Sequence, residues 1–273
     1  MSRPMHGTHH RTLRGILFLL ALGLGLTASA AEPFAHDDWA HVLEVRVDEQ
    51  GLVDYAGLAG DREALDRYVE RIHREGPKST PGAFPDREYE LAYYINAYNA
   101  LVFAGVLDRG VDTESVWSGG LISGYRFFVG MKVRVDGSKT NLRKLENEII
   151  REGYEDPRIH AALNCASIGC PRLPREPFLA DTLDAQLDQA IREFVSDPRH
   201  VRLDRSGKTV WISKIFDWFE EDFIHFERAQ GNEDPSLIDY INRYRATGEQ
   251  VPAGYAVEIL DYDKGLNRQG VEL

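Results

Sequence analysis

Cysteine is scarce in this sequence, with only Cys165 and Cys170 among 273 residues. Two cysteines are too few for a small fold that depends on a framework of disulfides. The sequence also contains no P-loop, dinucleotide-binding glycine pattern, G-x-S-x-G turn or H-E-x-x-H helix. These absences argue against nucleotide-dependent chemistry, and we expect no cofactor.

Positive charge is also in short supply. The chain has 32 Lys and Arg against 44 Asp and Glu, a net charge of −12. Because an acidic chain repels phosphate backbones and anionic lipid surfaces, we expect neither nucleic acid nor a membrane surface as a partner. The simpler meaning of this charge is solubility.

An uncharged, mostly apolar run lies near the N-terminus. Three arginines precede the uncharged stretch Gly15–Leu26, which ends in Ala28-Ser29-Ala30. This pattern is typical of a cleaved secretory signal, and the run is short for a membrane-spanning helix, which needs about 20 apolar residues. We therefore predict a signal peptide over residues 1–30, a periplasmic or secreted protein, and no stable membrane span after cleavage. An uncleaved anchor is the alternative.

The rest of the chain predicts a single α+β domain over residues 31–273. Helical spacing of apolar residues, or a capping Ser213, predicts helices over Asp37–Val45, Ala59–Arg74, Arg87–Leu107, Leu142–Arg151 and Leu183–Val195, and from Ser213 onward. Alternation and turn residues predict a strand over Phe127–Val135, a hairpin of Val201–Leu203 with Thr209–Ile212, and a last strand over Tyr255–Leu260. The breaker-rich loop 76–82 is only a minor boundary. We expect several amphipathic helices with short antiparallel strands.

The segment Asp156–Pro171 carries most of the information about function. It holds both cysteines and His160, and an apolar run, Ala161–Leu163, leads into Asn164 and Cys165. A cluster of this kind can host catalysis, bind a metal or carry a small disulfide loop.

A catalytic interpretation pairs Cys165 with His160, because a thiol needs a base or a positive field to ionise near neutral pH. Asn164, Asn96 or Asn99 would then orient the imidazole or stabilise an oxyanion. In a regular strand or helix, however, residues 160 and 165 point in different directions. The pairing therefore requires a turn or bulge before Cys165, or a histidine from elsewhere such as His225.

Three other interpretations of the cysteines stay open. A Cys165–Cys170 disulfide is favoured by export, and the intervening loop, with Gly169, can bring the two residues together. A metal site would use His160 and both cysteines, but the spacing matches no zinc motif and a fourth ligand is missing, so we predict no metal. Inert buried thiols are the remaining interpretation.

Asn96 and Asn99 stand three positions apart in a helix otherwise rich in Tyr, Ala, Leu and Val. A buried asparagine needs hydrogen-bond partners, so each either holds neighbouring backbone in place or lines a polar site.

Several motifs in order resemble the domain of unknown function 547 family over residues 90–267. They are Ile95–Val102, Asp156–His160, Asn164–Ser167, Cys170-Pro171, Ile212–Phe219, Asp222-Phe223, Leu260–Asp263 and Leu266-Asn267. Lys264 departs from the pattern, because a Trp is usual there. The resemblance implies no established activity. Relatives occur in exported bacterial proteins and in plant proteins inside the cell, which implies that the segment does not depend on a disulfide.

We therefore predict an exported protein with a Cys-His site that acts as a thiol-dependent acyl hydrolase or transferase. The predicted catalytic residues are Cys165, His160, Asn164, Asn96 and Asn99. The alternative is a non-catalytic binding module with a structural Cys165–Cys170 disulfide. In either case the expected partner is a small molecule or a peptide.

Overall fold

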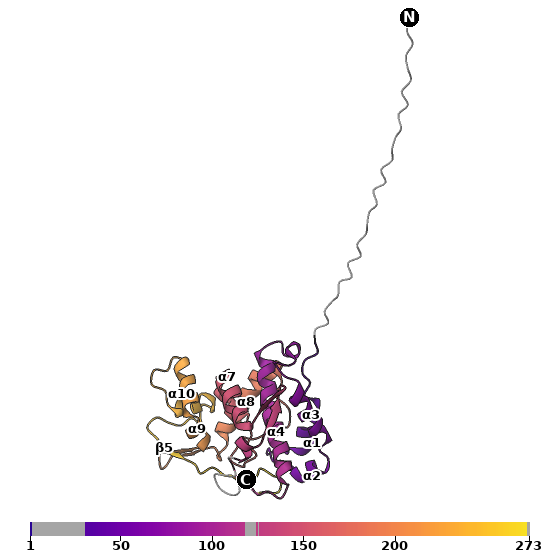
Figure 1. The fold of residues 1–273 in the computed structure, drawn as a ribbon. Coiled ribbons are helices and arrows are strands. Elements are labelled where there is room, and N and C mark those ends of the chain that lie inside the picture. The colour runs from indigo at the N-terminus through magenta and orange to yellow at the C-terminus, as the bar shows by residue number, and fades with distance from the viewer. Residues whose placement is uncertain (2–30, 118–123, 125, 272–273) are drawn as a thin grey trace. The chain divides into compact units, whose positions relative to one another are not determined.

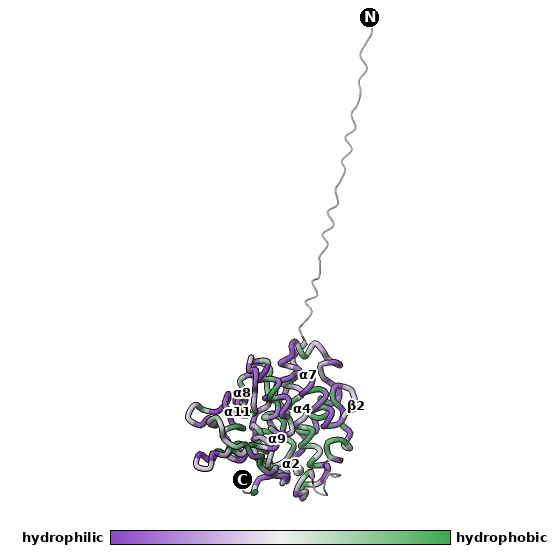
Figure 2. The backbone as a smooth tube through the Cα atoms, turned by 90° about the vertical axis from the view of Figure 1, so that its left-hand side faces the viewer, coloured by the Kyte–Doolittle hydropathy of each residue, from purple (hydrophilic) through white to green (hydrophobic). Residues whose placement is uncertain are grey.

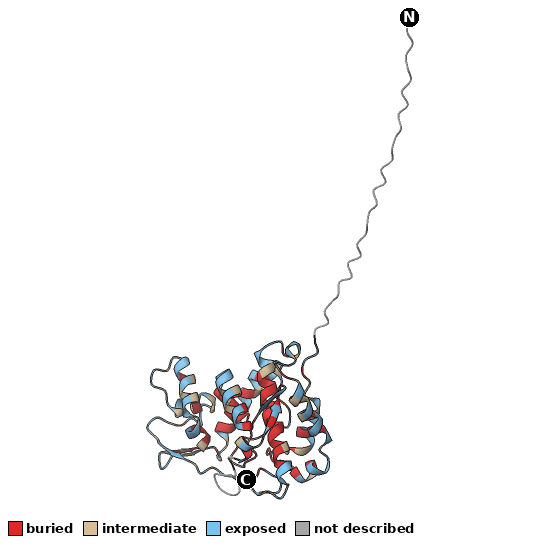
Figure 3. Ribbon diagram, in the orientation of Figure 1, coloured by how far each residue is buried: buried red, intermediate tan, exposed pale blue. Residues whose placement is uncertain are grey.

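The long helix α4 (Arg87–Arg109) lies at the centre of the computed structural model, which describes residues 1, 31–117, 124 and 126–271. It begins where the Asp86 side chain accepts hydrogen bonds from two backbone N–H groups, and it ends at Gly110, with φ of 104°. Every residue from Leu91 to Leu107 except Ala104 is buried, so neighbouring elements cover the helix on all sides. In Figure 3 the helix is accordingly mostly red. The helix predicted over Arg87–Leu107 is confirmed.

Three N-terminal helices pack beside α4, namely α1 (Asp37–Arg46), α2 (Tyr55–Gly60) and α3 (Glu63–Arg74). The first predicted helix is confirmed. The second, expected to begin at Ala59, begins at Glu63, because a separate short helix ends at Gly60 and the chain turns at Asp61. The short 3₁₀ helix η1 (Pro81–Ala83) precedes α4. The predicted signal peptide over residues 1–30 lies outside the described residues.

The strand predicted over Phe127–Val135 is wrong in its first half. Arg126–Gly130 forms the π-helix η2, and only β1 (Val133–Val135) is extended, paired with β2 (Ser138–Thr140) around an Asp136-Gly137 turn. Phe127 packs closely against α4 at Gly105, where an added Cβ would lie 3.1 Å from its ring. Burial of Phe127 and Phe128 therefore decides the local conformation, and the strand is limited to the residues that find a partner.

Residues 142–154 are helical, but not uniformly. They run as α6 (Leu142–Lys144), the π-helix η3 (Leu145–Arg151) and α7 (Glu152–Tyr154). The helix predicted over Leu142–Arg151 is thus confirmed, with a π segment that the sequence did not reveal. A 3₁₀ helix, η4 (Pro157–Ala161), follows and carries His160.

The C-terminal half combines helices with a three-stranded sheet. Its helices are η5 (Ala180–Thr182), α8 (Leu183–Ser196), α9 (Lys214–Trp218), α10 (Glu220–Ala229) and α11 (Leu237–Tyr244). Its strands are β3 (Val201–Asp204), β4 (Thr209–Ile212) and β5 (Ala256–Ile259). The predicted hairpin, the helix over Leu183–Val195, the Ser213 cap and the last strand are confirmed. β5 joins β4 in parallel, with Val210 opposite Val257, and this pairing was not predicted.

Helices with small antiparallel and mixed sheets make this an α+β fold, as predicted. The buried apolar residues form two clusters, one around α4 and one around α8 to α11. In Figure 2 the hydrophobic segments lie mainly inside and the hydrophilic ones along outer turns. None of the described helices is both long and apolar enough to cross a bilayer.

Candidate functional site

The two cysteines and His160 line one cavity of about 230 Å³. The chain leaves the 3₁₀ helix after Ala161 and is irregular up to Cys165, and the next residue, Ala166, has φ of 62°. A regular element would have pointed the two residues in different directions, but the element ends before Cys165. Both side chains therefore reach the same cavity, although no hydrogen bond joins them among the described residues.

Aromatic side chains form most of the remaining wall of this cavity. These side chains belong to elements far apart in the sequence: Tyr98 of α4, Trp117, Phe128 of η2, Trp218 of α9, Phe219 and Tyr262. Glu146, Asn147 and Arg143 are the other polar side chains of the lining. The cavity is therefore largely apolar, with a few polar groups directed at one place, which is the usual construction of a small-molecule site.

Cys165 and Cys170 are free thiols whose Sγ atoms lie 2.6 Å apart. The backbone N–H of Cys165 also donates to Sγ of Cys170, at 3.0 Å. A disulfide bond is about 2.05 Å long, so a small movement would bring the two sulfurs to bonding distance.

Tyr262 adds a hydroxyl to the cysteine pair. Its oxygen lies 3.0 Å from Sγ of Cys165 and 3.2 Å from Sγ of Cys170. The ring packs against Gly169, where an added Cβ would lie 2.9 Å from two ring carbons, and against Trp218 at 4.8 Å between centroids. Gly169 is therefore needed for this close approach, because any larger side chain would push the phenol away from the sulfurs.

These contacts shift the pKa values of the two thiols in opposite directions. The hydrogen bond between Cys165 and Cys170, helped by those with Tyr262 and Ser167, lowers the pKa of Cys165 in spite of burial. Burial raises the pKa of Cys170, and its bond to the neighbouring sulfur raises it further. Burial also raises the pKa of Tyr262, which keeps the phenol protonated as a donor. Cys165 is thus the thiol suited to act as a nucleophile, because the thiolate is the reactive form.

His160 is held from the side by a carboxylate. Its Nε2 lies 2.7 Å from Oδ2 of Asp222, and its ring stacks on Phe219 with centroids 4.1 Å apart. Its other ring nitrogen, Nδ1, has no hydrogen-bond partner among the residues that the structure describes. Burial lowers the pKa of His160, and Asp222 opposes this effect. The ring is therefore neutral near pH 7 and fixed in orientation, with one nitrogen available.

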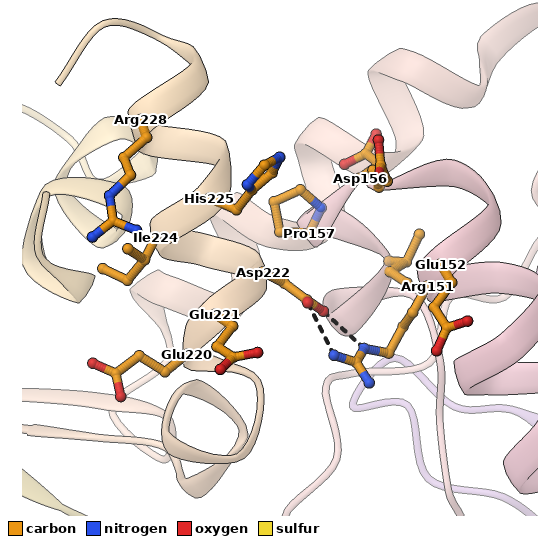
Figure 4. A pocket seen from close by; sticks show the side chains of 12 residues that line it. Arg151, Glu152, Asp156, Pro157, Glu220, Glu221, Asp222, Ile224, His225 and Arg228 are labelled. Carbon is orange, nitrogen blue, oxygen red and sulfur yellow. Dashed lines mark hydrogen bonds and ion pairs between the residues drawn. The ribbon is translucent and has the colours of Figure 1, made fainter. Parts of the chain in front are cut away.

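Asp222 is itself anchored by Arg151. The guanidinium donates to both carboxylate oxygens, at 2.8 and 2.9 Å. Burial acts to raise the pKa of Asp222, but the bonds from His160 and Arg151 outweigh it and hold that pKa well below its usual range. Figure 4 shows this ion pair from a second cavity, of about 590 Å³, in which Asp222 of α10 points toward Arg151 of η3. The described lining of that second cavity contains no Cys, Ser or Thr.

Residues 83–195 match the sequence model of a family described as "Protein of unknown function, DUF547". This chain therefore contains a DUF547 region. The matched region runs from η1 through α4 to α8 and includes His160, Cys165 and Cys170. No curated protein and no solved structure matches the chain.

Within the DUF547 region, the three asparagines of the predicted site bond mainly to backbone. Asn96 binds the backbone N–H and C=O of Phe178, and its amide nitrogen lies 3.4 Å from Nδ1 of His36. Asn99 donates to the carbonyl of Ala162 and accepts the N–H of Asn164. Their side chains thus hold the chain before and after Cys165 against α4, and neither lines the cavity.

Asn164 closes the loop that carries the cysteines. Its side chain donates to the carbonyl of Pro171 and accepts the N–H of Ala166 and a bond from Asn267. The bridge between Ser167 and Leu266 adds a second connection between this DUF547 segment and the C-terminal chain. Asn164 therefore positions the loop of Cys165 from both ends.

Reasoning from the sequence gave no role to three residues of the site: Asp222, Tyr262 and Glu146. Asp222 and Tyr262 belong to motifs shared with the family, Asp222-Phe223 and Leu260–Asp263, so a signal was present without a role. Glu146 stands on the polar face expected of an ordinary helix, and no signal pointed to it. His225 lines only the second of the two cavities. Among the described residues, no group of three His, Cys, Asp or Glu side chains is arranged to hold a metal.

Proposed function

We propose that this protein is a thiol-dependent acyl hydrolase or transferase, with Cys165 as nucleophile and His160 as base and then acid. One observation supports this most strongly. His160 is bound to Asp222 at Nε2, its Nδ1 is unpartnered among the described residues, and it lines the cavity that contains Cys165. An imidazole oriented by a carboxylate beside a nucleophile is the arrangement of acyl-transfer triads on unrelated folds.

In the first half-reaction, the thiol proton passes to His160 and Sγ of Cys165 forms a bond to the carbonyl carbon of an amide or thioester. The bond to the leaving nitrogen or sulfur then breaks, and the leaving group takes the proton from His160. In the second half-reaction, water attacks the thioester and gives a proton to His160. The acid is released, and His160 returns the proton to the sulfur.

Tyr262 supports both half-reactions as a hydrogen-bond donor. Its hydroxyl, 3.0 Å from Sγ of Cys165, stabilises the thiolate and then the oxygen that becomes negative during attack. Asn99 and Asn164 act as positioning residues, because their bonds fix the backbone on either side of the nucleophile.

The experiment is to trap the acyl group on the sulfur with an activated ester such as p-nitrophenyl acetate, and to read the adduct by intact-protein mass spectrometry. We expect one acetyl group on Cys165 and none in Cys165→Ala. In His160→Gln the adduct should form more slowly, because the same base takes the thiol proton, and once formed it should be hydrolysed about 10²- to 10⁴-fold more slowly. Cys170→Ser is the matched control, which keeps the nucleophile and still forms the adduct. A folded protein that is never acylated at Cys165 would contradict the proposal.

A second candidate rests on the 2.6 Å separation of the two sulfurs. If Cys165 and Cys170 are bonded in the working protein, the cavity is a non-catalytic binding site for a small molecule or a peptide, held together by the bridge. The aromatic walls would then provide the binding surface. This candidate predicts no thiol until reductant is added.

We also propose that the protein is exported, on the basis of the apolar run Gly15–Leu26 and the Ala28-Ser29-Ala30 sequence. N-terminal sequencing of the protein made by its native host should begin at Ala31. A mature chain that begins at Met1 or Ser2 would contradict export by cleavage.

A further inference from the structure

Glu146 is the one carboxylate in the described lining of the Cys165 cavity. It lies in the π-helix η3, and such π segments often occur at functional sites because they re-aim side chains. The hydroxyl of Tyr98 donates to its Oε2 at 3.1 Å. Its second oxygen, Oε1, has no hydrogen-bond partner among the described residues. One oxygen is thus held in place and the other is available.

No cation of the described chain forms a salt bridge with Glu146. Arg151, five positions later, is committed to Asp222 and to the side chain of Asn147. Arg143 also lines the cavity, but it is an exposed residue and no ion pair joins it to Glu146. A carboxylate in a largely apolar cavity is costly unless it is paired. Burial accordingly raises the pKa of Glu146, although Arg151 and Arg143 oppose this effect from a distance. A cation brought by a ligand would supply a direct ion-pair partner.

The walls around Glu146 favour a particular kind of cation. Phe128 and Trp218 line the same cavity, and aromatic faces attract an ammonium group through their π-electrons. Trp117, in the same wall, already holds the ammonium group of Lys264, 5.6 Å from its ring centroid. Together with a carboxylate, such walls select a positively charged ligand over a neutral or negative one of the same size.

We propose that the site takes acyl substrates that carry a protonated amine near the scissile carbonyl, with the ammonium group bound between Glu146 and the aromatic walls. This inference rests on the proposed acyl chemistry at Cys165 and names its substrate class. It also gives Glu146 an effect on the nucleophile. The negative charge of Glu146 opposes a thiolate on Cys165 and so acts to raise the pKa of that thiol, and a bound ammonium group cancels this effect.

The test compares the rates at which differently charged reagents modify Cys165. The chain has only two cysteines, so the Cys170→Ser protein carries a single thiol and whole-protein mass reports on Cys165 alone. The probes are three methanethiosulfonates of similar size: 2-aminoethyl (cationic), ethyl (neutral) and 2-sulfonatoethyl (anionic). Each rate is divided by the rate with free cysteine. Measurement at about 0.5 M salt suppresses the general attraction of an acidic protein for cations.

We expect the cationic reagent to react about tenfold faster than the neutral one, since opposite charges at contact in a partly buried site attract strongly. Glu146→Gln should reduce this ratio several-fold. Glu148→Gln is the matched control, because it removes the same charge from the same helix at an exposed residue near Lys144, outside the cavity. Arg143→Gln should increase the ratio.

The outcomes separate the two proposals. If the neutral reagent reacts rapidly and the cationic reagent reacts no faster, the proposed substrate class is wrong, but Cys165 can still be the nucleophile. The substrate class would also be wrong if Glu146→Gln and Glu148→Gln reduce the ratio of cationic to neutral rates by the same factor. If all three reagents react slowly, Cys165 is not an activated thiol and both proposals are wrong. The ratio measured with Glu146 intact is a test in itself, whether or not the variant folds.

Discussion

The hydroxyl of Tyr262 lies 3.0 Å from Sγ of Cys165, although 97 positions separate the two residues in the chain. This contact brings the C-terminal segment onto the loop that carries both cysteines, and it places a donor on the thiol with the lower pKa. Together with His160 and Asp222, it defines the site from which the proposed chemistry follows.

Tyr262→Phe should make Cys165 a more ordinary thiol. Removing the hydroxyl removes a donor that lowers the pKa of Cys165. The pKa of Cys165 therefore rises, and a smaller fraction of the thiol is ionised at a pH below that pKa. We expect alkylation by iodoacetamide at pH 6 to slow about tenfold, the effect of one hydrogen bond to a charged group. Tyr255→Phe is the matched control, because Tyr255 is partly exposed and its hydroxyl contacts only the carbonyl of Arg205. Equal alkylation rates in the two variants would show that Tyr262 does not stabilise the Cys165 thiolate.

Cys170 should act on Cys165 through hydrogen bonding as well as through a possible bridge. Its hydrogen bond is the largest contribution that lowers the pKa of Cys165. We therefore expect Cys170→Ala to shift the alkylation profile of Cys165 to higher pH, and Cys170→Ser, which keeps a donor, to shift it less. Both variants should stay fully alkylatable after exposure to air. A larger shift in the serine variant would show that the donor role is wrong.

Asp222→Asn should change the pKa of His160 and lower turnover while the protein still folds. The Asp222 carboxylate acts to raise the pKa of His160, so the variant should titrate at a lower pH, as followed by NMR of the ring protons. Acyl turnover should fall about 10²-fold or more, since the imidazolium loses its counter-charge. Unfolding free energy should fall by about 1–3 kcal/mol, because Arg151 and His160 each lose a charged partner.

Asp217→Asn provides the comparison for that variant, because Asp217 pairs with Lys214 at the surface in the preceding helix. Unchanged turnover in Asp222→Asn, with the protein folded, would exclude the carboxylate from the mechanism.

The fold could be predicted from the sequence wherever local pattern decides local structure. The α4 helix, the hairpin of β3 and β4 and the cap at Ser213 all follow from spacing, turn residues or a capping side chain. The segment Phe127–Gly130 could not, because its conformation depends on burial against Gly105 and not on alternation. The π segment Leu145–Arg151 has the apolar spacing of an α-helix, so its π-type hydrogen bonding could not be predicted from the sequence.

The candidate site divides in the same way. Cys165, His160 and the asparagines are conspicuous because unusual residue types cluster within a few positions. Asp222 and Tyr262 come from segments 62 and 97 positions away from their partners, and only the packing of η4 against α10 and of the last segment against the cysteine loop brings them in. His160 and Cys165 line one cavity because η4 ends after Ala161, and the sequence pattern does not show where that helix ends.

Asn164→Ala should destabilise the protein and loosen the cysteine loop together. The buried side chain satisfies the carbonyl of Pro171, the N–H of Ala166 and the amide of Asn267, and the variant leaves these groups without a partner. We expect the free energy of unfolding in urea to fall by about 3 kcal/mol. Asn232→Ala, which loses one turn contact to the N–H of Asp234, should cost less than about 1 kcal/mol. Similar losses in the two variants would argue against a special role for Asn164.

Acid should destabilise the protein partly through His200. Burial lowers the pKa of His200 from 6.5 to about 4, and its Nε2 has no hydrogen-bond partner among the described residues. The unfolded chain therefore binds a proton at His200 that the folded chain refuses, so the stabilisation is complete above pH 6.5 and is lost as the pH falls toward 4. His200→Phe should remove up to about 3 kcal/mol of this loss in urea unfolding at pH 4 relative to pH 7. The exposed His41→Gln should leave it unchanged.

The central claim is that Cys165 is an activated nucleophile, and the pH dependence of its alkylation in the absence of reductant tests it most directly. Mass spectrometry of the purified protein would give the labelling rate of Cys165 from pH 5 to 10. We predict rapid labelling at pH values where an unperturbed thiol, with a pKa near 8.5, is still protonated. Labelling that appears only after reductant is added, or that follows the profile of a free cysteine, would contradict the account.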